Sequence, residues 1–500
     1  MIRQLMICAF VLLAAVTAGA QRRMPCIRHD EGGARRNTRT VLPDLTRVWD
    51  AGRIYRVPVV LITFKDRDFS MDVPAAYYQR LFNEPGYNEG VGKGCVADYF
   101  RDQSGGLCNL QFDIYGPVQV DTLMQLNTDK NYGNYAMRKA MERLRETEQT
   151  DFSIYDWDGN GEVDQVLFIA AGYCGNSTMG CIWPSTSFSY YKTPGGKNLT
   201  MVSISCEQWN DEHRCGIGTI IHEFSHCLGL PDLYPTSSDG GYSVVDDWDL
   251  MDGGNYINWG WCPPNYSALE KMQVGWGSPV ELTEQTSISG MKPVSEGGTA
   301  YLIRNSGVAD EYYLLENRRQ TGWDYGIPGN GLLIAHVDYD PYAWSDNSVN
   351  ISKGHRRYDF FHPDGKGYAD WDPAQNGRDM GKYTMDNRLR SRYLSTTVYP
   401  YTDIETGVVI HSLTDDSDPA ATLFNKNAAM TFRMSKPVTN IRMADDGTIS
   451  FDFMQATGIE SPVVDTTDDD DWYDLQGRRL KVRPTRKGLY IHHGKKESIR

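Results

Sequence analysis

The sequence predicts an α/β domain, in which one motif-bearing helix packs against a mixed sheet, followed by an all-β, sandwich-like region. Up to about residue 276, buried-strand patterns alternate with helical patterns. From residue 278 to residue 456, short β-prone runs are separated by Gly, Asp, Asn and Pro. With 500 residues the chain is too long for one typical core, so we expect several domains.

The elements of the first region, residues 51–277, follow from hydrophobic periodicity. Apolar runs rich in Val and Ile predict strands buried on both faces, whereas strict alternation predicts a half-buried strand. Apolar residues at helical spacing predict amphipathic helices. On this basis we expect strands at 56–64, 109–120 and 163–173 and helices at 75–83, 95–102 and 134–146.

The second region, residues 278–456, is expected to contain strands without helices. Its β-prone runs lie at 299–305, 311–318, 330–339, 407–413, 428–434 and 447–453. An acidic linker, residues 457–471, then leads to a short basic module, residues 472–500. From Tyr473 onward this module has nine Lys or Arg against two acids, although the whole chain has a net charge of −15. No basic region is large enough to indicate a nucleic-acid site.

Residues 1–20 predict a secretory signal peptide. Arg3 precedes an apolar run that ends in the small residues Ala18-Gly19-Ala20, so we expect cleavage before Gln21. A membrane anchor would need a longer apolar run, and no later segment provides a transmembrane segment. We therefore expect a secreted or surface-located protein, with residues 21–50 as a propeptide or flexible N-terminal segment.

Ten cysteines agree with an oxidising compartment. Loss of Cys8 with the signal peptide leaves nine, so at least one thiol has no disulfide partner within the chain. The close spacings 95/108, 174/181 and 206/215 favour disulfides that close short loops.

The stretch GTIIHEFSHCLGLPDLY, residues 218–234, predicts a metal site. His222 and His226 share one helix face, about 6 Å apart along the axis. Zinc accepts neutral imidazole nitrogens and keeps an open position when three protein ligands bind. Glu223 can act on a water without itself coordinating the metal. Two surface histidines are the alternative, but the apolar sequence GIGTII before them indicates a buried helix.

The third ligand is inferred by elimination. No glutamate lies between Glu223 and Glu270, which argues against a glutamate ligand from a following helix. Gly229 permits the left-handed conformation that ends a helix, and Pro231 prevents the helix from resuming. Asp232 is the first oxygen donor beyond that turn; its alternative role is a helix-end or turn carboxylate. The pattern is the metzincin motif with its third histidine replaced by aspartate.

The chain resembles the immune inhibitor A-like family of secreted zinc metallopeptidases, over roughly residues 55–455. The matching stretches are HEFSHCLGLPDLY, WDLMDGG, YSALEKMQVGW, CVADYFRDQSGG and YYLLENRRQTGWDYGIPGNGLLIAHVDY. The resemblance implies a metzincin-like zinc peptidase fold, with Glu223 as general base and Met251 in the methionine turn below the metal. It implies zinc ligation by His222, His226 and Asp232.

The implied activity is a zinc-dependent metalloendopeptidase that cleaves extracellular protein or peptide substrates. Glu223 would take a proton from the attacking, zinc-activated water and deliver it to the leaving amine. Tyr256 is a candidate for holding the oxyanion, with plain packing as the alternative. Two other functions compete: a catalytically retired scaffold that binds partners at the surface, and a zinc amidase acting on cell-wall peptides. The intact Glu223 argues against the retired scaffold.

The loop DWDGNGEVD, residues 156–164, predicts a partial calcium site. Oxygen donors occupy loop positions 1, 3, 5 and 9, namely Asp156, Asp158, Asn160 and Asp164. Position 12 is Leu167 and a strand is expected to follow, so the loop is not an EF-hand. A tight Asn-Gly turn without calcium is the alternative.

Three further features carry weaker interpretations. Cys26 is a candidate latency thiol on the zinc, with a disulfide to the catalytic domain as the alternative. His336 and Asp338 are expected to be structural, and residues 316–318 to form a structural charge network. The tail YDLQGRRLKVRPTRKGLYIHHGKK resembles the sorting modules of type IX secretion, which would make that machinery a partner; an ordinary basic β-appendage is the alternative.

Overall fold

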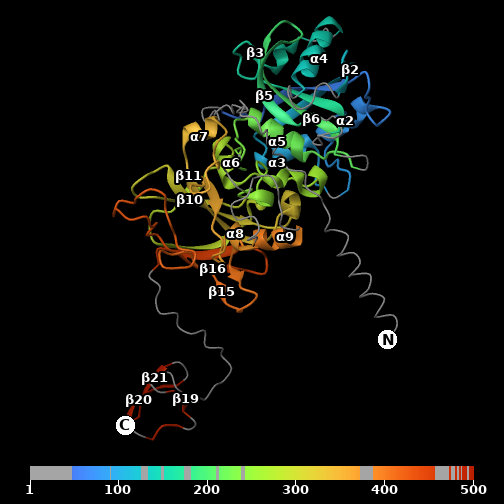
Figure 1. Ribbon diagram of the computed structural model, residues 1–500. Helices are drawn as coiled ribbons and strands as arrows, with labels where there is room; N and C mark the ends of the chain where they lie inside the picture. Colours follow the sequence, from blue (N-terminus) through green and yellow to red (C-terminus); the bar gives the residue numbers. More distant parts are fainter. Residues whose placement is uncertain are drawn as a thin grey trace, which may run out of the picture. The chain divides into compact units, whose positions relative to one another are not determined.

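The computed structural model describes residues 48–90, 92–124, 133–147, 151–173, 182–209, 213–237, 242–371 and 387–455, with short segments between 472 and 499. The chain divides into two units, Met1–Met454 and Gln455–Arg500 (Figure 1). The predicted signal peptide, Cys26 and the acidic linker lie outside the described residues. Among the helices that are described, none has the length and apolar character needed to cross a membrane.

A six-stranded sheet lies at the centre of the first region. Its order is β2-β1-β4-β6-β3, and β5 also pairs with β6. All pairs are parallel except β5 with β6, so the sheet is mixed, as predicted. The strands are β1 (Ile54–Thr63), β2 (Asn109–Gln119), β3 (Glu162–Val163), β4 (Val166–Tyr173), β5 (Ser185–Lys192) and β6 (Asn198–Gln208).

Helices cover both faces of this sheet. On β1, Val59 and Leu61 join the core that contains Phe224 of α5, whereas Val60 joins the core that contains Met137 of α4. Burial on both faces explains the continuous apolar runs of β1 and β4. The helices are α2 (Pro74–Asn83), α3 (Val96–Gln103) and α5 (Gly218–Cys227) on one face and α4 (Asn134–Thr147) on the other.

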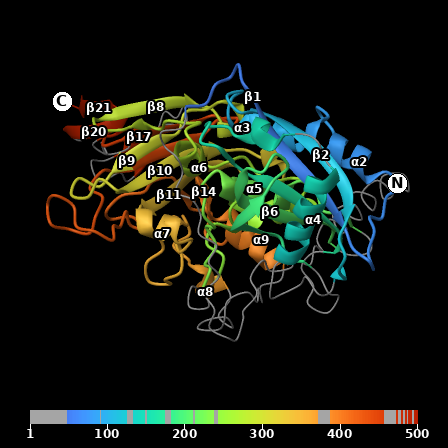
Figure 2. The same cartoon turned by 90° about the horizontal axis from the view of Figure 1, so that it is seen from above.

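The second region contains two sheets that share a core. Ile303 and Ile334 of the first sheet pack with Phe451 of the second. Figure 2 shows β8 and β17 of the second sheet side by side. The first sheet contains β7 (Val280–Glu281), β9 (Tyr301–Arg304), β10 (Glu311–Arg318), β11 (Gly331–Asp338), β12 (Tyr358–Phe360) and β13 (Val398–Tyr399). The second contains β8 (Thr286–Met291), β16 (Val438–Met443) and β17 (Ile449–Phe453), and β14 (Tyr401–Thr402) pairs with β15 (Val409–Ile410).

The opposite face of β10 and β11 belongs to the same core as the motif helix. Leu314 and Val337 are buried in the cluster that also contains Phe100 and Phe224. The two regions therefore share one continuous apolar core, although the sequence predicts a boundary between residues 277 and 278. That boundary stays a prediction, while the shared core shows that elements beyond it support α5.

The second region is β-rich rather than all-β. It contains α7 (Pro341–Ser345), α8 (Tyr368–Trp371) and α9 (Asn387–Ser395). Helix α7 forms because the Asp340 side chain caps the Tyr342 amide and Pro341 occupies the first turn. The strand expected at 428–434 is also wrong, because Met430 has a φ of 64° in a turn closed onto Asn427.

The remaining elements are short. Helix α6 (Ala268–Gln273) begins with a capping box of Ser267 and Glu270. The 3₁₀ helices are η2 (Phe152–Tyr155), η4 (Asp246–Trp248), η5 (Gly253–Gly260), η6 (Val294–Glu296) and η7 (Gly322–Gly326). The C-terminal unit is an antiparallel sheet of β19 (Arg479–Leu480), β18 (Trp472–Tyr473), β20 (Gly488–His492) and β21 (Lys495–Ile499), in that order.

Candidate metal centre

The end of helix α5 orients the second histidine and turns the chain toward the aspartate. Gly229 has a φ of 97°, as the sequence predicted for this position. Its amide donates to the His226 carbonyl, and the Leu230 amide donates to the Ser225 carbonyl at 3.1 Å. These two bonds form the helix ending that needs a left-handed residue. The Leu230 carbonyl in turn lies 2.7 Å from His226 Nδ1, so one turn ends the helix and fixes an imidazole.

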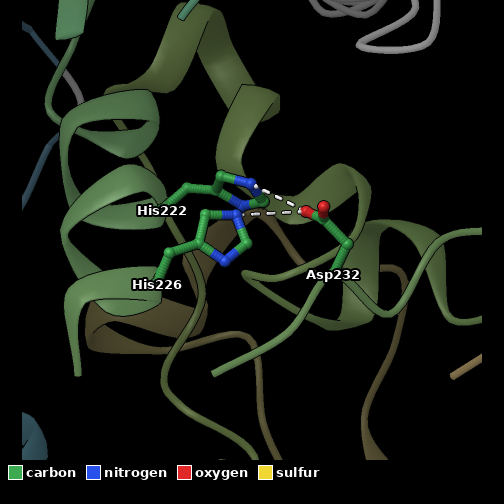
Figure 3. A group of neighbouring side chains, drawn as sticks. All are labelled: His222, His226 and Asp232. Carbon is green, nitrogen blue, oxygen red and sulfur yellow. Dashed lines mark ion pairs between the residues drawn. The ribbon is translucent and has the colours of Figure 1, made fainter. Parts of the chain in front are cut away.

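The structure brings the three predicted ligands together in a buried position. His222 Nε2 lies 3.2 Å from Asp232 Oδ1, and His226 Nε2 lies 3.3 Å from the same oxygen (Figure 3). One donor atom from each of the three residues lies within 4.8 Å of the others. All three side chains are buried.

The two imidazoles are held in the tautomer that suits metal binding. His222 Nδ1 lies 2.9 Å from the Leu250 carbonyl, and His226 Nδ1 faces the Leu230 carbonyl. Because a carbonyl only accepts, each Nδ1 carries a proton. A neutral ring then has its lone pair on Nε2, which is the nitrogen that faces Asp232. Metal-ligating histidines are held in the same way.

These residues fit a zinc ion. Asp232 Oδ1 is buried and accepts no hydrogen bond among the described residues, which is costly unless a cation is bound there. With zinc–ligand bonds of 2.0–2.1 Å, ligand atoms in a tetrahedron lie about 3.3 Å apart. The distances of 3.2 and 3.3 Å from this oxygen to the two Nε2 atoms agree with that edge length. Two imidazoles and one carboxylate are also a typical ligand set for zinc.

Proton binding in the triad follows from burial and charge. Burial alone would raise the pKa of Asp232, but the imidazoles, His226 first, lower it well below its usual range. Burial would lower the pKa of His226, but the Asp232 carboxylate outweighs it and raises this pKa to about 9. Without a metal, the triad therefore binds a proton at neutral pH, and a metal cation would have to displace it.

Glu223 lies beside the triad and contacts the edge strand of the sheet. Its Oε2 accepts a hydrogen bond from Thr186 Oγ1 of β5, at 2.8 Å. Burial raises the pKa of Glu223, although the neighbouring imidazoles and the Thr186 hydroxyl oppose that rise. A carboxyl group whose pKa is raised above its ordinary value holds a proton more readily, which suits a group that accepts and donates protons in a reaction.

The predicted methionine turn is connected to both ligand-bearing segments. Met251 is fully buried, and its amide donates to Asp249 Oδ1 at 2.8 Å. The Leu233 amide, next to Asp232, donates to the Met251 carbonyl at 2.8 Å. The preceding carbonyl, that of Leu250, is the one that orients His222. Tyr256, the oxyanion candidate, packs edge-on against Trp209 with ring centroids 5.2 Å apart.

The acidic loop forms a second carboxylate cluster. Asp156, Asp158 and Asp164 each offer an oxygen within 4.8 Å of the others; β3 lies within the loop, and β4 is the strand that follows it. Asp156 accepts the amides of Gly159 and Gly161, and its Oδ2 lies 3.3 Å from Lys197 Nζ. The remaining donors are also engaged: Asp158 accepts the Asn160 amide, Asn160 accepts the Glu162 amide, and Asp164 accepts the Trp157 amide.

The residues that the sequence assigned to structural roles form ion pairs in the second region. His336 Nε2 lies 2.8 Å from Glu311 Oε1, and Asp338 contacts His355 and Arg357. Within the predicted charge network, the fully buried Arg318 lies between Glu316 and Asp324. Asn317 instead donates to the carbonyls of Met291 and Gly447.

Among the described cysteines, the suggested disulfides 95/108 and 206/215 are not formed. Cys95 Sγ instead caps α3 by accepting the Asp98 amide at 3.4 Å. Cys174 and Cys181 lie outside the described residues.

Sequence reasoning missed two residues that contact the centre. Thr186 lies on β5, whose sequence STSFSYYK has no continuous apolar run. Asn347 donates from Nδ2 to Asp232 Oδ2, and its Oδ1 accepts the Asp232 amide, both at 2.6 Å. It follows Asp232 by 115 residues, so no local pattern could connect the two.

Comparison with known proteins supports the assignment of this centre. Residues 194–272, which include the triad, Glu223 and Met251, match the family model "Immune inhibitor A peptidase M6, catalytic domain". The chain is 24% identical over 200 residues to Immune inhibitor A of Bacillus thuringiensis subsp. alesti, covering 36% of this chain and 27% of that protein. It is 23% identical over 250 residues to the Pre-pro-metalloprotease PrtV of Vibrio cholerae serotype O1, covering 43% of this chain and 26% of that protein. The matches thus span about a quarter of these curated relatives, and residues 194–272 resemble an M6 peptidase catalytic domain.

Proposed function

We propose that this protein is a zinc-dependent metalloendopeptidase that hydrolyses peptide bonds in extracellular proteins. The observation that carries the proposal is a buried triad with Glu223 beside it: backbone carbonyls fix both imidazoles through Nδ1, and Asp232 Oδ1 accepts no hydrogen bond from the described residues. Similarity to M6 peptidases over the same residues supports the proposal.

His222, His226 and Asp232 would hold the zinc ion, which supplies a lowered pKa for a water and polarisation of the scissile carbonyl. Glu223 accepts the proton of the attacking water and passes it to the leaving amine. Thr186 orients the Glu223 carboxylate through its hydroxyl. We assign Met251 to the turn that supports the ligands and keep Tyr256 as the oxyanion candidate.

The position of strand β5 is an argument for a peptide as the substrate. Among the described strands β5 pairs with β6 alone, so its other edge has backbone groups that an extended chain can bind. Thr186 on this strand contacts the Glu223 carboxylate. A peptide added along β5 would therefore pass the proposed base.

Further parts of the proposal concern the rest of the chain. We propose a calcium ion at Asp156, Asp158, Asn160 and Asp164, supported by the convergence of three carboxylates there. Three more proposals rest on the sequence patterns alone. They are secretion after cleavage near Ala20/Gln21, latency through Cys26, and sorting by type IX secretion through residues 472–500.

The test compares wild-type protein with Glu223→Ala in zinc content and in cleavage of an unfolded protein substrate. We expect about one zinc in each sample and cleavage by wild type alone, since Glu223 is not a ligand. Zinc in both samples without cleavage by either, also after removal of residues 21–50, would favour the retired scaffold. Release of cell-wall peptides in place of protein cleavage would favour the amidase. Absence of zinc from wild type would refute the metal site.

A further inference from the structure

The third ligand of the proposed zinc site contacts a residue from the second region. Asn347 lies just after α7, and its side chain forms two hydrogen bonds with Asp232: Oδ1 accepts from the Asp232 backbone amide, and Nδ2 donates to Asp232 Oδ2. With 4% of its surface exposed, Asn347 makes these contacts in a buried position. The two oxygens of the Asp232 carboxylate therefore have different partners. Oδ2 accepts a hydrogen bond from Asn347 Nδ2, and Oδ1 faces the two imidazoles.

The backbone at Asn347 explains why asparagine occupies this position. Its amide donates to the Trp344 carbonyl and the Ser348 amide donates to the Ala343 carbonyl, which is the same helix ending that follows α5. Asn347 has a φ of 53°, the left-handed conformation that glycine and asparagine adopt at low cost. Glycine would satisfy the turn but would provide no amide for Asp232.

From this geometry we propose that Asn347 is a positioning residue that makes Asp232 a one-oxygen ligand. The Asn347 amide engages Oδ2, so that only Oδ1 is available to the metal. A carboxylate that binds through one oxygen leaves a coordination position for water and substrate, whereas two-oxygen binding would fill it. This inference rests on the proposed function, because it concerns the ligand set of the proposed zinc ion.

The chain offers a matched control. Asn440 also has a φ of 53°, and its Nδ2 donates to Asp452 Oδ2 at 2.8 Å. Asn440 and Asp452 lie on β16 and β17, in the sheet on the far side of β10 and β11 from the α5 core. Replacing either asparagine by glycine removes the same kind of hydrogen bond without straining the backbone.

The experiment measures zinc affinity by competition with a chelator, using the full chain and the variants Asn347→Gly and Asn440→Gly. We expect Asn347→Gly to weaken zinc binding by about 10- to 100-fold, the usual effect of removing a partner of a metal ligand. We expect Asn440→Gly to leave the affinity unchanged. Equal affinity in all three proteins would overturn the proposal.

A second readout separates positioning from general stability. Four-coordinate Co²⁺ absorbs visible light strongly, and this absorption weakens when coordination number rises. Substituted with Co²⁺, Asn347→Gly should lose intensity as Oδ2 becomes available, while Asn440→Gly keeps the wild-type spectrum. An unchanged spectrum for Asn347→Gly would overturn the proposal.

If Asn347→Gly does not fold, Asn347→Asp replaces it, because this variant keeps the acceptor for the Asp232 amide, loses the donor to Oδ2 and adds a carboxylate that repels Oδ2 from that side. The same loss of Co²⁺ absorption is expected, and an unchanged spectrum again overturns the proposal. Failure of wild type to bind any metal would instead refute the proposed function, and this inference with it.

Discussion

The described part of the chain contains two clusters of potential metal ligands, and they differ in the hydrogen bonds that their oxygens accept. In the buried triad, backbone carbonyls hold both imidazoles through Nδ1, and no residue that the structure describes donates a hydrogen bond to Asp232 Oδ1. In the acidic loop, Asp156, Asp158 and Asp164 accept amides of their own loop, and Asp158 is exposed. The triad therefore presents ligand atoms to a metal ion, whereas the loop carboxylates also stabilise the loop through hydrogen bonds to its amides. We therefore expect the proposed activity to require the metal at the first cluster, and the metal at the second cluster to have a secondary role.

The largest difference should appear on deletion of one carboxylate from each cluster. We expect Asp232→Ala to lose zinc and to reduce peptidase activity by at least about 10³-fold, because two imidazoles alone do not complete a catalytic zinc site. Asp158→Ala should retain full zinc content and lose calcium binding. Zinc analysis, calcium titration and a peptidase assay on both variants make the comparison. Loss of zinc from Asp158→Ala would contradict the division into two independent clusters.

The pH dependence of metal binding should also separate the clusters. In the metal-free His226–Asp232 pair, the pKa of His226 is about 9 instead of the ordinary histidine value of 6.5. The proton on His226 therefore stabilises the fold fully below pH 6.5, and this stabilisation is lost as the pH rises through 9. Zinc must displace this proton, so its apparent affinity should fall about tenfold per unit as pH decreases below 9. Burial raises the pKa of Asp156, but the amides of Gly161 and Gly159 and the Lys197 ammonium lower it overall. That carboxyl is already ionised near neutrality.

We therefore expect no comparable slope for calcium between about pH 8 and pH 6. Chelator-competition titrations at three pH values measure both metals on the same sample. Parallel slopes for zinc and calcium would show that the two clusters do not differ in proton competition.

The smallest effect concerns the lysine beside the loop. Lys197 Nζ lies 3.3 Å from Asp156 Oδ2, where it competes with a cation for that oxygen. Lys197→Gln should increase calcium affinity by about two- to fivefold, the scale of a partly exposed charge interaction. Lys192→Gln is the control, because Lys192 contacts Asn198 rather than a loop carboxylate. Calcium-dependent shifts in melting temperature report the affinity, and equal shifts in the two variants would refute competition.

Much of the fold could be predicted because its signals are local. The strands β1 and β4 are buried on both faces and form continuous apolar runs, and α4 has apolar residues at helical spacing. Gly229 at the end of α5 has the predicted left-handed conformation. Strand β5 was missed because its sequence, which mixes Ser and Thr with aromatic residues, has no continuous apolar run.

The candidate site could be predicted where its residues are adjacent in sequence. The triad and Glu223 fall within eleven positions of one motif, residues 222–232, and helix geometry relates them. Thr186 and Asn347 reach the site through sheet pairing and through a turn far along the chain. Tertiary contacts of this kind have no fixed spacing, so the sequence alone does not indicate them.

The position of Asn347 along the chain has a consequence for biosynthesis. Synthesis runs from the N-terminus, so the histidine pair of α5 emerges long before the asparagine that holds Asp232, which follows 115 residues later. The same order applies to Leu314 and Val337, which complete the core around α5. A nascent chain that ends before residue 347 has the helix motif without the amide that positions its third ligand. Under the proposed function, the metal site would therefore be complete only after the second region has been made.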